Sequence, residues 1–500
     1  ALQLPAFKAI IDRFHINVEL HFQLYLLANI SYYLTVYQAQ PRLHVQALWL
    51  IRTWSKTLAA VLPVRAVDNH RKAFIRDLQQ RLASERHAFL KTRVTDLEKL
   101  PESADLDILV PPATVQRLVD FAKHYPTVHK VNCCRKSFMT TLELYFSDRT
   151  YLSLDLLSRF QRKAYNILPA EQVLDSAHRN RAGFSVPAAH FDLEYAFLFY
   201  VLNGRSLPPR YVEHFERYPA EKQTIFMAYL NAQYGLQLSA ISDLSAIPEA
   251  DRLQVRAVVK NLPQNKGRER LRQQWAYVQD TVRDMVLRKG FVITFSGVDG
   301  AGKSTIIEAL RQQLVQRYRK KVVVLRHRPS VLPILSSWTK GKARAEADAA
   351  ATLPRQGRNR NSLASLLRFT YYFTDYLFGQ LYVYTRYLLR GYVVLYDRYY
   401  FDFINDGPRS NIRLPKWLTR LGYGLVLKPR LNFFLHAPSE VILQRKQELD
   451  KEAIGDLTSA YLQLFSQYDQ RYRHSQYIGI QNIDQDATME TILEAYTKAA

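Results

Sequence analysis

The pattern of hydrophobic and polar positions changes once along the chain, close to residue 288. Before that point hydrophobic residues recur at helical spacing, and Pro, Asn and Asp mark the turns. After it, short runs of β-branched residues alternate with helical patterns, which is typical of a parallel α/β sheet. Glycine follows the same division, since 13 of the 17 glycines lie at or beyond Gly290. The pattern therefore predicts a helix-rich α+β part followed by an α/β part.

A chain of 500 residues supports roughly two to four structural units. We predict three: an N-terminal helical region over residues 1–83, an α+β domain with a helical extension over 84–287, and an α/β domain over 288–500. Residues 261–288 read as a basic turn followed by a long helix that leads into the last domain.

Residues 20–40 contain no formally charged side chain, and a stretch of this length can span a membrane. Polar residues such as Gln23 and Asn29 interrupt it, so we favour a buried or partner-facing helix and leave a peripheral membrane contact open. The first residues do not form a secretory signal. The two cysteines, Cys133 and Cys134, have no second pair at metal-site spacing. We therefore predict a cytoplasmic protein in a reducing compartment.

The chain carries 69 Lys and Arg against 45 Asp and Glu, a formal net charge of +24. Hydrophobic residues at 48% and charged residues at 23% exclude a disordered or multi-span membrane chain. The excess charge favours anionic partners such as phosphorylated ligands, nucleic acid or an acidic membrane surface, and does not choose among them. Basic residues gather at 267–272 and 340–361, but no nucleic-acid module accompanies them, so nucleic acid ranks last.

The run GVDGAGKST at residues 297–305 matches a phosphate-binding loop (P-loop, Walker A), G-x-x-x-x-G-K-[ST], at every fixed position. It follows a hydrophobic strand pattern and precedes an amphipathic helix. Glycines let backbone N–H groups wrap a phosphate closely, and the helix N-terminus adds its positive end. We expect Lys303 to bridge the β- and γ-phosphates and the Ser304 hydroxyl to bind Mg²⁺. The predicted nucleotide-binding residues are Gly297, Gly300, Ala301, Gly302, Lys303, Ser304 and Thr305.

A second hydrophobic strand pattern, at 391–396, ends in Asp397 and Arg398. A parallel sheet presents groups to a ligand at the carboxyl ends of its strands. We therefore expect Asp397 to hold Mg²⁺ or its water and Arg398 to neutralise a phosphate. The alternative is an aspartate that caps a helix beside a solvated arginine.

With these two motifs, residues 288–500 resemble the thymidylate kinase family of nucleoside monophosphate kinases. The likeness also includes Arg328 and Pro329 after a strand at 321–325, a helix at 366–390, a strand at 431–435 and a lid-like RKQE at 445–448. It implies a parallel five-stranded P-loop sheet, ATP and Mg²⁺ as cofactors, phosphoryl transfer to a small-molecule acceptor, and a homodimer.

Family roles carry over position by position. Asp299 resembles the acidic group near the acceptor sugar, and Arg398 resembles the phosphate-facing arginine. The loop has Gly300 where some members place a catalytic arginine, so the cation that closes on the transferred group would come from the lid, with Arg445 first and Lys446 second. The implied catalytic residues are Lys303, Asp397, Arg398 and Arg445.

Two departures from the family pattern concern the acceptor. The family has an Asp-Arg pair on its acceptor helix, where this chain has Asp375 and Tyr376. It also has Arg-Glu-Pro where this chain has His327, Arg328 and Pro329. Both departures point away from thymidylate itself. The predicted acceptor-binding residues are Asp299, Arg328, Asp375 and Arg398. The many nearby tyrosines are mostly core at helical spacing, with a sugar or base pocket as the alternative.

Asp105 and Asp107 lie two residues apart in a strand pattern, and Asp155 lies in another. Three carboxylates from neighbouring strands can hold two Mg²⁺ ions for nucleotidyl transfer. Residues 84–202 resemble the polymerase-β-like nucleotidyltransferase fold, whose Gly-Ser signature precedes the paired aspartates. The first glycine here is Gly183, so we favour this fold with weak or no catalysis over an active enzyme. Surface acidic residues on an unrelated fold are the third interpretation.

These observations predict a P-loop kinase, an ATP-dependent phosphotransferase whose acceptor is a small nucleotide or a sugar-containing metabolite. The alternative is a nucleotide-gated binding or scaffold protein with a degenerate nucleotidyltransferase domain. The pairing of the two domain types connects that alternative loosely with surface-polysaccharide biosynthesis. An enzyme should release ADP when an acceptor is present, whereas a switch should bind ATP and hydrolyse it slowly without one.

Overall fold

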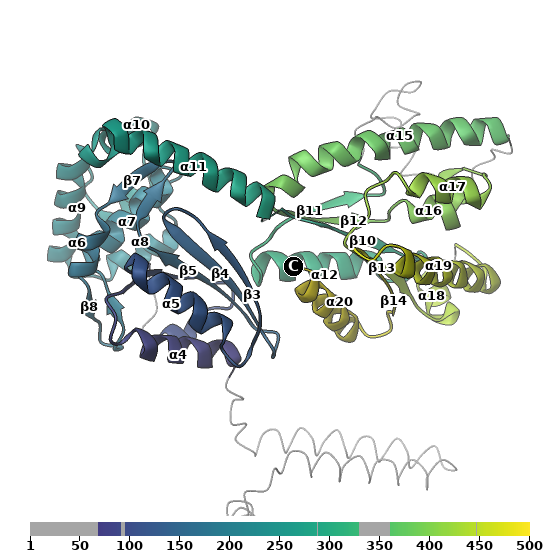
Figure 1. The fold of residues 1–500 in the computed structure, drawn as a ribbon, viewed down its shortest axis with the longest axis horizontal. Helices are drawn as coiled ribbons and strands as arrows, with labels where there is room; N and C mark the ends of the chain where they lie inside the picture. Colours follow the sequence, from purple (N-terminus) through teal and green to yellow (C-terminus); the bar gives the residue numbers. More distant parts are fainter. Residues whose placement is uncertain (1–68, 92–95, 288, 330–360, 447) are drawn as a thin grey trace, which may run out of the picture. The chain divides into compact units, whose positions relative to one another are not determined.

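The computed structural model describes residues 69–91, 96–287, 289–329, 361–446 and 448–500. The uncharged stretch at 20–40 and, apart from Asn361, the basic segment at 340–361 lie outside these residues. Residues His70–Ala500 form one compact unit, which contains two five-stranded sheets (Figure 1). In the described part of the chain, no helix combines the length and the apolar character that crossing a bilayer needs.

The first sheet mixes parallel and antiparallel strands. Its elements are α4 (His70–Leu82), β1 (Ala88–Leu90), η1 (Leu97–Lys99), β2 (Leu106–Leu109), α5 (Pro112–Lys123), β3 (Val128–Arg135), β4 (Met139–Phe146) and β5 (Tyr151–Leu157). The strand order is β1-β2-β5-β4-β3, in which β2 and β5 are parallel and the other neighbours antiparallel. Phe74 of α4 and Leu118 of α5 share a buried core with β2, β4 and β5. The helix before residue 83 therefore packs on this sheet.

A mostly helical region with its own core follows the first sheet. Its elements are β6 (Phe160–Arg162), β7 (Tyr165–Leu168), α6 (Ala170–Asp175), β8 (His178–Arg179), β9 (Ser185–Val186), α7 (Ala189–Val201), α8 (Pro209–Glu216), α9 (Ala220–Tyr234), η2 (Ile241–Ala246), α10 (Glu249–Asn261), η3 (Pro263–Asn265) and α11 (Gly267–Leu287). The core surrounds Phe197 and Leu230. Because α11 begins at Gly267, the basic residues expected in a turn lie in its first helical turns instead.

The second sheet is entirely parallel, in the order β11-β12-β10-β13-β14. Its elements are β10 (Val292–Ser296), α12 (Lys303–Gln316), β11 (Lys321–Arg326), α15 (Ser362–Arg386), η4 (Leu388–Arg390), β12 (Tyr392–Asp397), α16 (Phe401–Asn405), η5 (Gly407–Ser410), α17 (Lys416–Tyr423), β13 (Leu431–His436), α18 (Ser439–Arg445), α19 (Lys451–Arg471), β14 (Gln476–Gln481) and α20 (Gln485–Ala499). The predicted five-stranded parallel sheet is confirmed, and so is the change from α+β to α/β along the chain.

Helices cover both faces of the second sheet, which explains its nearly continuous hydrophobic strands. Leu395 of β12 packs with α12 and α20 on one face. The neighbouring Val394 and Tyr396 pack with α15, α16, α17 and α19 on the other. This alternation follows from the two-residue period of a strand.

The two sheets are joined by buried tyrosines and ion pairs. Tyr145 and Tyr151 of the first sheet lie in one buried cluster with Tyr318, just after α12, and Tyr496 of α20. Lys320 Nζ lies 2.7 Å from Glu143 Oε1 on β4. The end of α12 is therefore attached to the first sheet, while its first residue, Lys303, belongs to the phosphate-binding loop.

Candidate functional site

The predicted phosphate-binding loop connects the carboxyl end of β10 to the start of α12. Gly300 and Gly302 have φ angles of 90° and 84°, a region that favours glycine. A Cβ on Gly302 would lie 2.4 Å from Asn482 Nδ2, and one on Gly297 would lie 2.3 Å from the Leu435 carbonyl oxygen. Only glycine fits these positions, so the chain makes the tight loop at a helix N-terminus that phosphate binding requires.

Lys303 lies in the centre of this loop and is 6% exposed. Its Nζ donates to the carbonyl oxygens of Gly297 and Val298, at 2.8 and 3.0 Å. Burial and the nearby Arg398 lower the pKa of Lys303 to about 8. The ammonium is thus held by neutral oxygens that a phosphate can replace.

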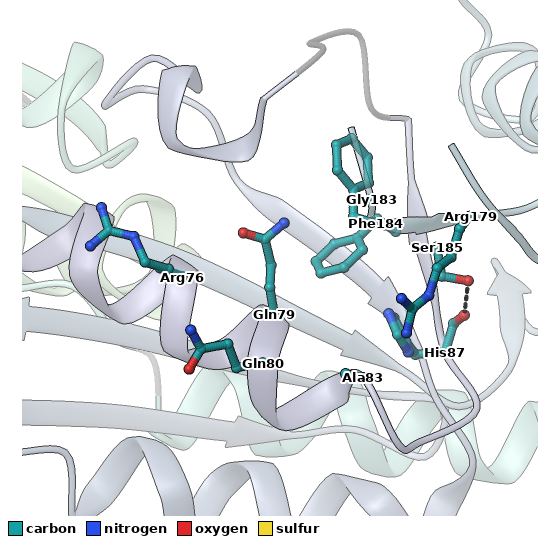
Figure 2. Close-up of a pocket in the computed structure, with 10 residues that line it drawn as sticks. Arg76, Gln79, Gln80, Ala83, His87, Arg179, Gly183, Phe184 and Ser185 are labelled. Atoms are coloured by element: carbon teal, nitrogen blue, oxygen red, sulfur yellow. Dashed lines mark hydrogen bonds between the residues drawn. The ribbon is translucent and has the colours of Figure 1, made fainter. Parts of the chain in front are cut away.

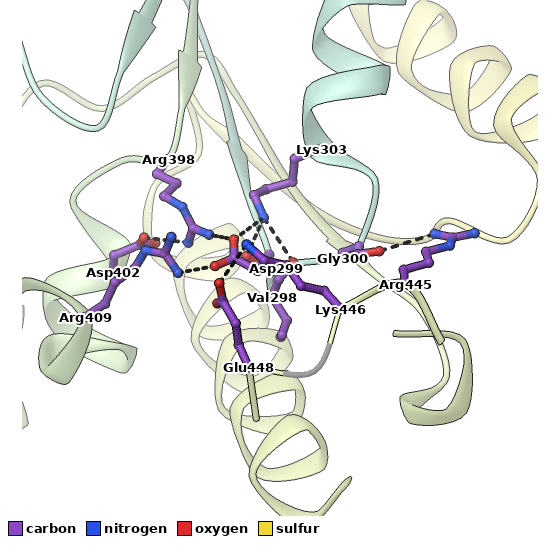
Figure 3. A network of polar contacts seen from close by, with 12 residues as sticks. Val298, Asp299, Gly300, Lys303, Arg398, Asp402, Arg409, Arg445, Lys446 and Glu448 are labelled. Atoms are coloured by element: carbon purple, nitrogen blue, oxygen red, sulfur yellow. Dashed lines mark hydrogen bonds and ion pairs between the residues drawn. The ribbon is translucent and has the colours of Figure 1, made fainter. Parts of the chain in front are cut away.

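Asp299 is the anion at the centre of the cationic cluster in Figure 3. Arg398 and Arg409 both donate to its carboxylate, the latter at 2.5 Å, and Lys303 Nζ lies 3.6 Å away. Burial by itself would raise the pKa of Asp299, but Arg398, a hydrogen bond with Glu448, Lys303 and Arg409 together hold it well below its usual range. Asp299 therefore stays ionised and orients two arginines toward the loop.

A second carboxylate, that of Asp402, also holds the Arg398 guanidinium in place. Its NH1 donates to Asp402 Oδ2 at 3.0 Å, and the buried Asp402 also accepts from the Tyr461 hydroxyl at 2.7 Å. Arg398 has a φ of 72°, which a side chain of this size rarely adopts. Two carboxylates and a strained backbone thus hold this guanidinium in one place.

Asp397, at the carboxyl end of β12, fits the role of a magnesium ligand. Its Oδ1 is buried and has no hydrogen-bond partner among the described residues. A buried carboxylate oxygen without a partner is uncommon and costly, and a carboxylate is a preferred ligand of Mg²⁺. Ser304 is exposed in the first turn of α12. These two residues offer the donor set of a P-loop magnesium site.

The lid candidates come from the end of α18 and the residues after it. Arg445 NH1 donates to the Gly300 carbonyl oxygen at 3.3 Å, whereas Lys446 pairs with Glu448 at 2.6 Å. Figure 3 shows Arg445 on the opposite side of the loop from Arg398 and Arg409. Of these two residues, Arg445 is therefore the one that donates a hydrogen bond to the loop.

The predicted acceptor residues Arg328 and Asp375 pair with each other. Arg328 NH1 lies 2.9 Å from Asp375 Oδ2, Asp375 is fully buried, and the Arg328 guanidinium lies 5.1 Å from the centre of the Tyr372 ring. The Tyr376 hydroxyl donates to the His327 carbonyl. Asp299 and Arg398 pair with each other as well, so the four predicted acceptor residues form two ion pairs.

A second site lies on the first sheet. Asp107 of β2 is the direct partner of Asp155 on the parallel strand β5, and Asp105 precedes β2. One carboxylate oxygen from each of the three lies within 4.8 Å of the others. They line a cleft of about 190 Å³ together with Lys91, Arg162 and Tyr195. We call this the carboxylate cleft.

Two positively charged side chains form ion pairs with aspartates of the carboxylate cleft. Lys91 Nζ lies 2.5 Å from Asp107 Oδ2, and Arg319 NH1, beyond the end of α12, lies 2.6 Å from Asp105 Oδ1. Burial, with the like charges of Asp105 and Asp155, raises the pKa of Asp107 to about 7. Burial would lower the pKa of Lys91, but Asp107 raises it well above the usual value. The lysine therefore stays charged.

Lys91 is held in place by the chain around it. Its φ is 53°, its backbone N–H donates to Asp192 Oδ1 at 2.7 Å, and its ammonium lies 5.4 and 5.0 Å from the ring centres of Tyr195 and Phe199. Cation–π contacts and a strained backbone fix the ammonium at Asp107. Because Lys91 and Arg319 contact two of the three carboxylates, these residues do not fit a two-magnesium site.

A third feature is a cavity of about 260 Å³ between α4, β1 and the β8–β9 hairpin (Figure 2). Its buried floor includes Phe89 and Phe184. Arg76 in its wall pairs with Glu98 at 2.8 Å, and Ser185 donates to the His87 carbonyl at 2.9 Å. Arg76 and Ser185 therefore make contacts that support the structure around this cavity.

Several residues of these sites were not predicted from the sequence. Asp402 lies four residues after Arg398, a helical spacing that could have signalled the pair. Lys91 directly follows a strand, and Arg319 lies in a basic turn, neither of which is a specific signal. Asn482, which donates to the Ala301 carbonyl at 2.8 Å, has no sequence signal either.

No protein-family model matches the chain. Among solved structures, thymidylate kinase from Candida albicans is similar at 19% identity and a TM-score of 0.30, over 42% of this chain and 92% of that one. Thymidylate kinase from Ehrlichia chaffeensis is similar at 17% identity and a TM-score of 0.27, over 42% of this chain and 99% of that one. These likenesses are too distant to carry an activity or a substrate to this chain.

Proposed function

We propose that residues 288–500 form an ATP-dependent phosphotransferase that transfers the γ-phosphoryl group to a small nucleotide or a sugar-containing acceptor. The observation that carries this proposal is the pair formed by Lys303, held by loop carbonyls at 2.8 and 3.0 Å, and Asp397, whose buried Oδ1 has no partner among the described residues. A P-loop lysine beside an unsatisfied carboxylate supports binding of a nucleotide with its metal ion.

Each residue of the loop has a task in this proposal. The loop N–H groups and the start of α12 bind the β-phosphate. Lys303 moves its ammonium from the Gly297 and Val298 carbonyls to phosphate oxygens. Ser304 and Asp397 would hold Mg²⁺, which when bound neutralises negative charge on those oxygens. Arg445, already at the Gly300 carbonyl, brings its charge to the transferred group.

The acceptor would bind at Asp299 and its arginines. The ionised Asp299 can accept a hydrogen bond from an acceptor hydroxyl, and Arg398 and Arg409 can neutralise an acceptor phosphate. Because Arg328 pairs with the buried Asp375, its charge is already balanced. This balance supports including uncharged acceptors such as free sugars among the candidates.

The test is a panel of nucleoside monophosphates and sugars, scored for acceptor-dependent ADP release. We expect one acceptor class to stimulate release, and Lys303→Ala to abolish it. Lys451→Ala is the matched control, since this lysine is 69% exposed and forms its ion pair with Glu440 on α18. Undiminished phosphoryl transfer by Lys303→Ala would overturn the proposal.

The second candidate, a nucleotide-gated binding protein, is favoured by one observation. Helix α12 begins at Lys303 and leads to Arg319 and Lys320, which pair with Asp105 and Glu143 of the first sheet. In this candidate function, a nucleotide bound at the loop changes the stability of the first sheet through these ion pairs. This candidate predicts slow ATP hydrolysis that does not depend on an acceptor. It also predicts that ATP changes the rate of amide hydrogen exchange in β2 and β4, and that Arg319→Ala abolishes this effect of ATP. Acceptor-dependent ADP release that is unchanged in Arg319→Ala would favour the kinase.

A further inference from the structure

Helix α11 has its polar and apolar sides reversed relative to an ordinary surface helix. Its most buried residues are Gln273 and Asp280, 3% and 8% exposed. The Asp280 carboxylate accepts from the backbone N–H and the hydroxyl of Ser137, and Gln273 donates to the Gln264 carbonyl. A surface helix normally buries its apolar side, so this helix is attached to its own molecule by polar groups.

The apolar side of α11 faces outward. Its five central residues are Leu271, Trp275, Val278, Val282 and Met285, with exposed fractions of 67%, 65%, 49%, 55% and 42%. They follow one another at intervals of four, three, four and three residues. This is the spacing by which one helix packs along another. We call these five residues the α11 stripe.

We propose that the α11 stripe is a self-association surface, which pairs antiparallel with the α11 stripe of a second copy of this chain. With the neighbouring Val286, which is 62% exposed, the side chains expose on the order of 600 Å², which lies at the lower end of the area that each partner contributes to a specific interface. The surface is therefore large enough for a stable dimer, and an exposed apolar patch of this size marks an interaction site.

Shape favours the antiparallel direction. A two-fold axis at Val278 sets Leu271 against the partner's Met285, and Trp275 against the partner's Val282. The largest side chain of the stripe, Trp275, then meets the smaller Val282. In a parallel pair Trp275 would meet the partner's Trp275, and the two rings would separate the helices at the neighbouring valines.

The oligomeric state of the full chain tests this proposal by sedimentation equilibrium over a range of concentrations. We expect a dimer, and we expect Trp275→Glu to raise its dissociation constant by roughly 100-fold, because it buries a charge at the centre of the seam. Leu421→Glu on α17 is the matched control, since Leu421 is 68% exposed and lies outside α11. Unchanged circular dichroism and thermal midpoint in Trp275→Glu show that the variant is folded.

Cysteine cross-linking tests the direction of the pair. Val278→Cys should form a disulfide-linked dimer on mild oxidation, whereas Leu271→Cys alone should not, because antiparallel pairing separates the two Leu271 positions. Wild type controls for the native Cys133 and Cys134. Efficient cross-linking through Leu271→Cys would overturn the antiparallel arrangement.

Two results would overturn self-association itself. One is a dimer that Trp275→Glu does not weaken, which would place the interface elsewhere. The other is a wild-type monomer in which Trp275→Glu lowers the thermal midpoint and exposes residues 1–69 to protease. That result would show that the uncharged stretch at 20–40 of the same chain, and not a second copy, binds the α11 stripe.

Discussion

The phosphate-binding loop and the carboxylate cleft both place aspartates beside cations at strand ends, but they treat a key carboxylate differently. At the loop, Asp397 keeps a buried oxygen that no described residue satisfies. In the cleft, Asp107 has Lys91 at 2.5 Å. A carboxylate without a partner is suited to an external cation, whereas a paired one already has its counter-ion. The two sites therefore differ in whether the chain itself supplies the counter-ion of the aspartate.

The difference begins in the residue that follows each strand. After β10 the chain has Gly297, whose missing side chain lets the loop lie against β13. After β1 it has Lys91, which adopts a φ of 53° and sends its ammonium to Asp107. Glycine leaves backbone donors for a phosphate, whereas lysine places a positive charge beside Asp107.

The largest effect that would test this comparison is expected for Asp397→Asn. The amide keeps the shape of the side chain but removes the negative charge that attracts Mg²⁺, so acceptor-dependent ADP release should fall by about 1,000-fold. Steady-state kinetics over a range of Mg²⁺ concentrations measures this, and higher Mg²⁺ should restore part of the rate. Asp469→Asn on α19, away from the loop, is the control. A variant with normal Mg²⁺ dependence would show that Asp397 has no role in metal binding.

The next effect concerns the stability of the cleft. Lys91→Met leaves Asp107 buried without its counter-ion, so the free energy of unfolding should fall by about 3 kcal/mol at pH 8. Urea unfolding measures this loss.

Calorimetric titration with Mn²⁺ should then detect an ion at the three carboxylates in Lys91→Met only. The double variant Lys91→Met, Asp107→Asn should regain stability and lose Mn²⁺ binding. Equal Mn²⁺ binding by wild type would contradict the role of Lys91.

Sequence alone identifies the loop because its information is local. A hydrophobic strand, a glycine-rich turn and a helix are contiguous, so Gly297, Lys303 and Ser304 could be placed before the fold was known. The five-stranded parallel sheet, now confirmed, followed from the resemblance that this motif supports. The convergence of Asp105, Asp107 and Asp155 could also be expected from strand patterns.

The ion partners of these aspartates could not be predicted in the same way. Lys91 and Arg319 reach the cleft from segments far apart in the chain. Such pairs depend on how elements pack in three dimensions, which hydrophobic periodicity does not specify. The exposure of the apolar side of α11 could not be predicted for the same reason. The sequence pattern shows that a helix has a polar and an apolar side, but it does not show which side is buried.

The smallest effect is a pH dependence at the backbone of Lys91. Asp192 accepts the Lys91 N–H, and burial raises the pKa of Asp192 to about 6, above an unfolded value of about 4. Between these pH values the folded state binds more protons than the unfolded state, so this group lowers stability as pH rises through the window. Asp192→Asn cannot ionise and should lack this contribution, which amounts to about 2 kcal/mol between pH 4 and pH 7. Urea unfolding of both proteins across this range measures the difference. Parallel pH profiles for wild type and Asp192→Asn would show that Asp192 is ionised throughout, and that Lys91 is held in place by a charged partner on its backbone as well as on its side chain.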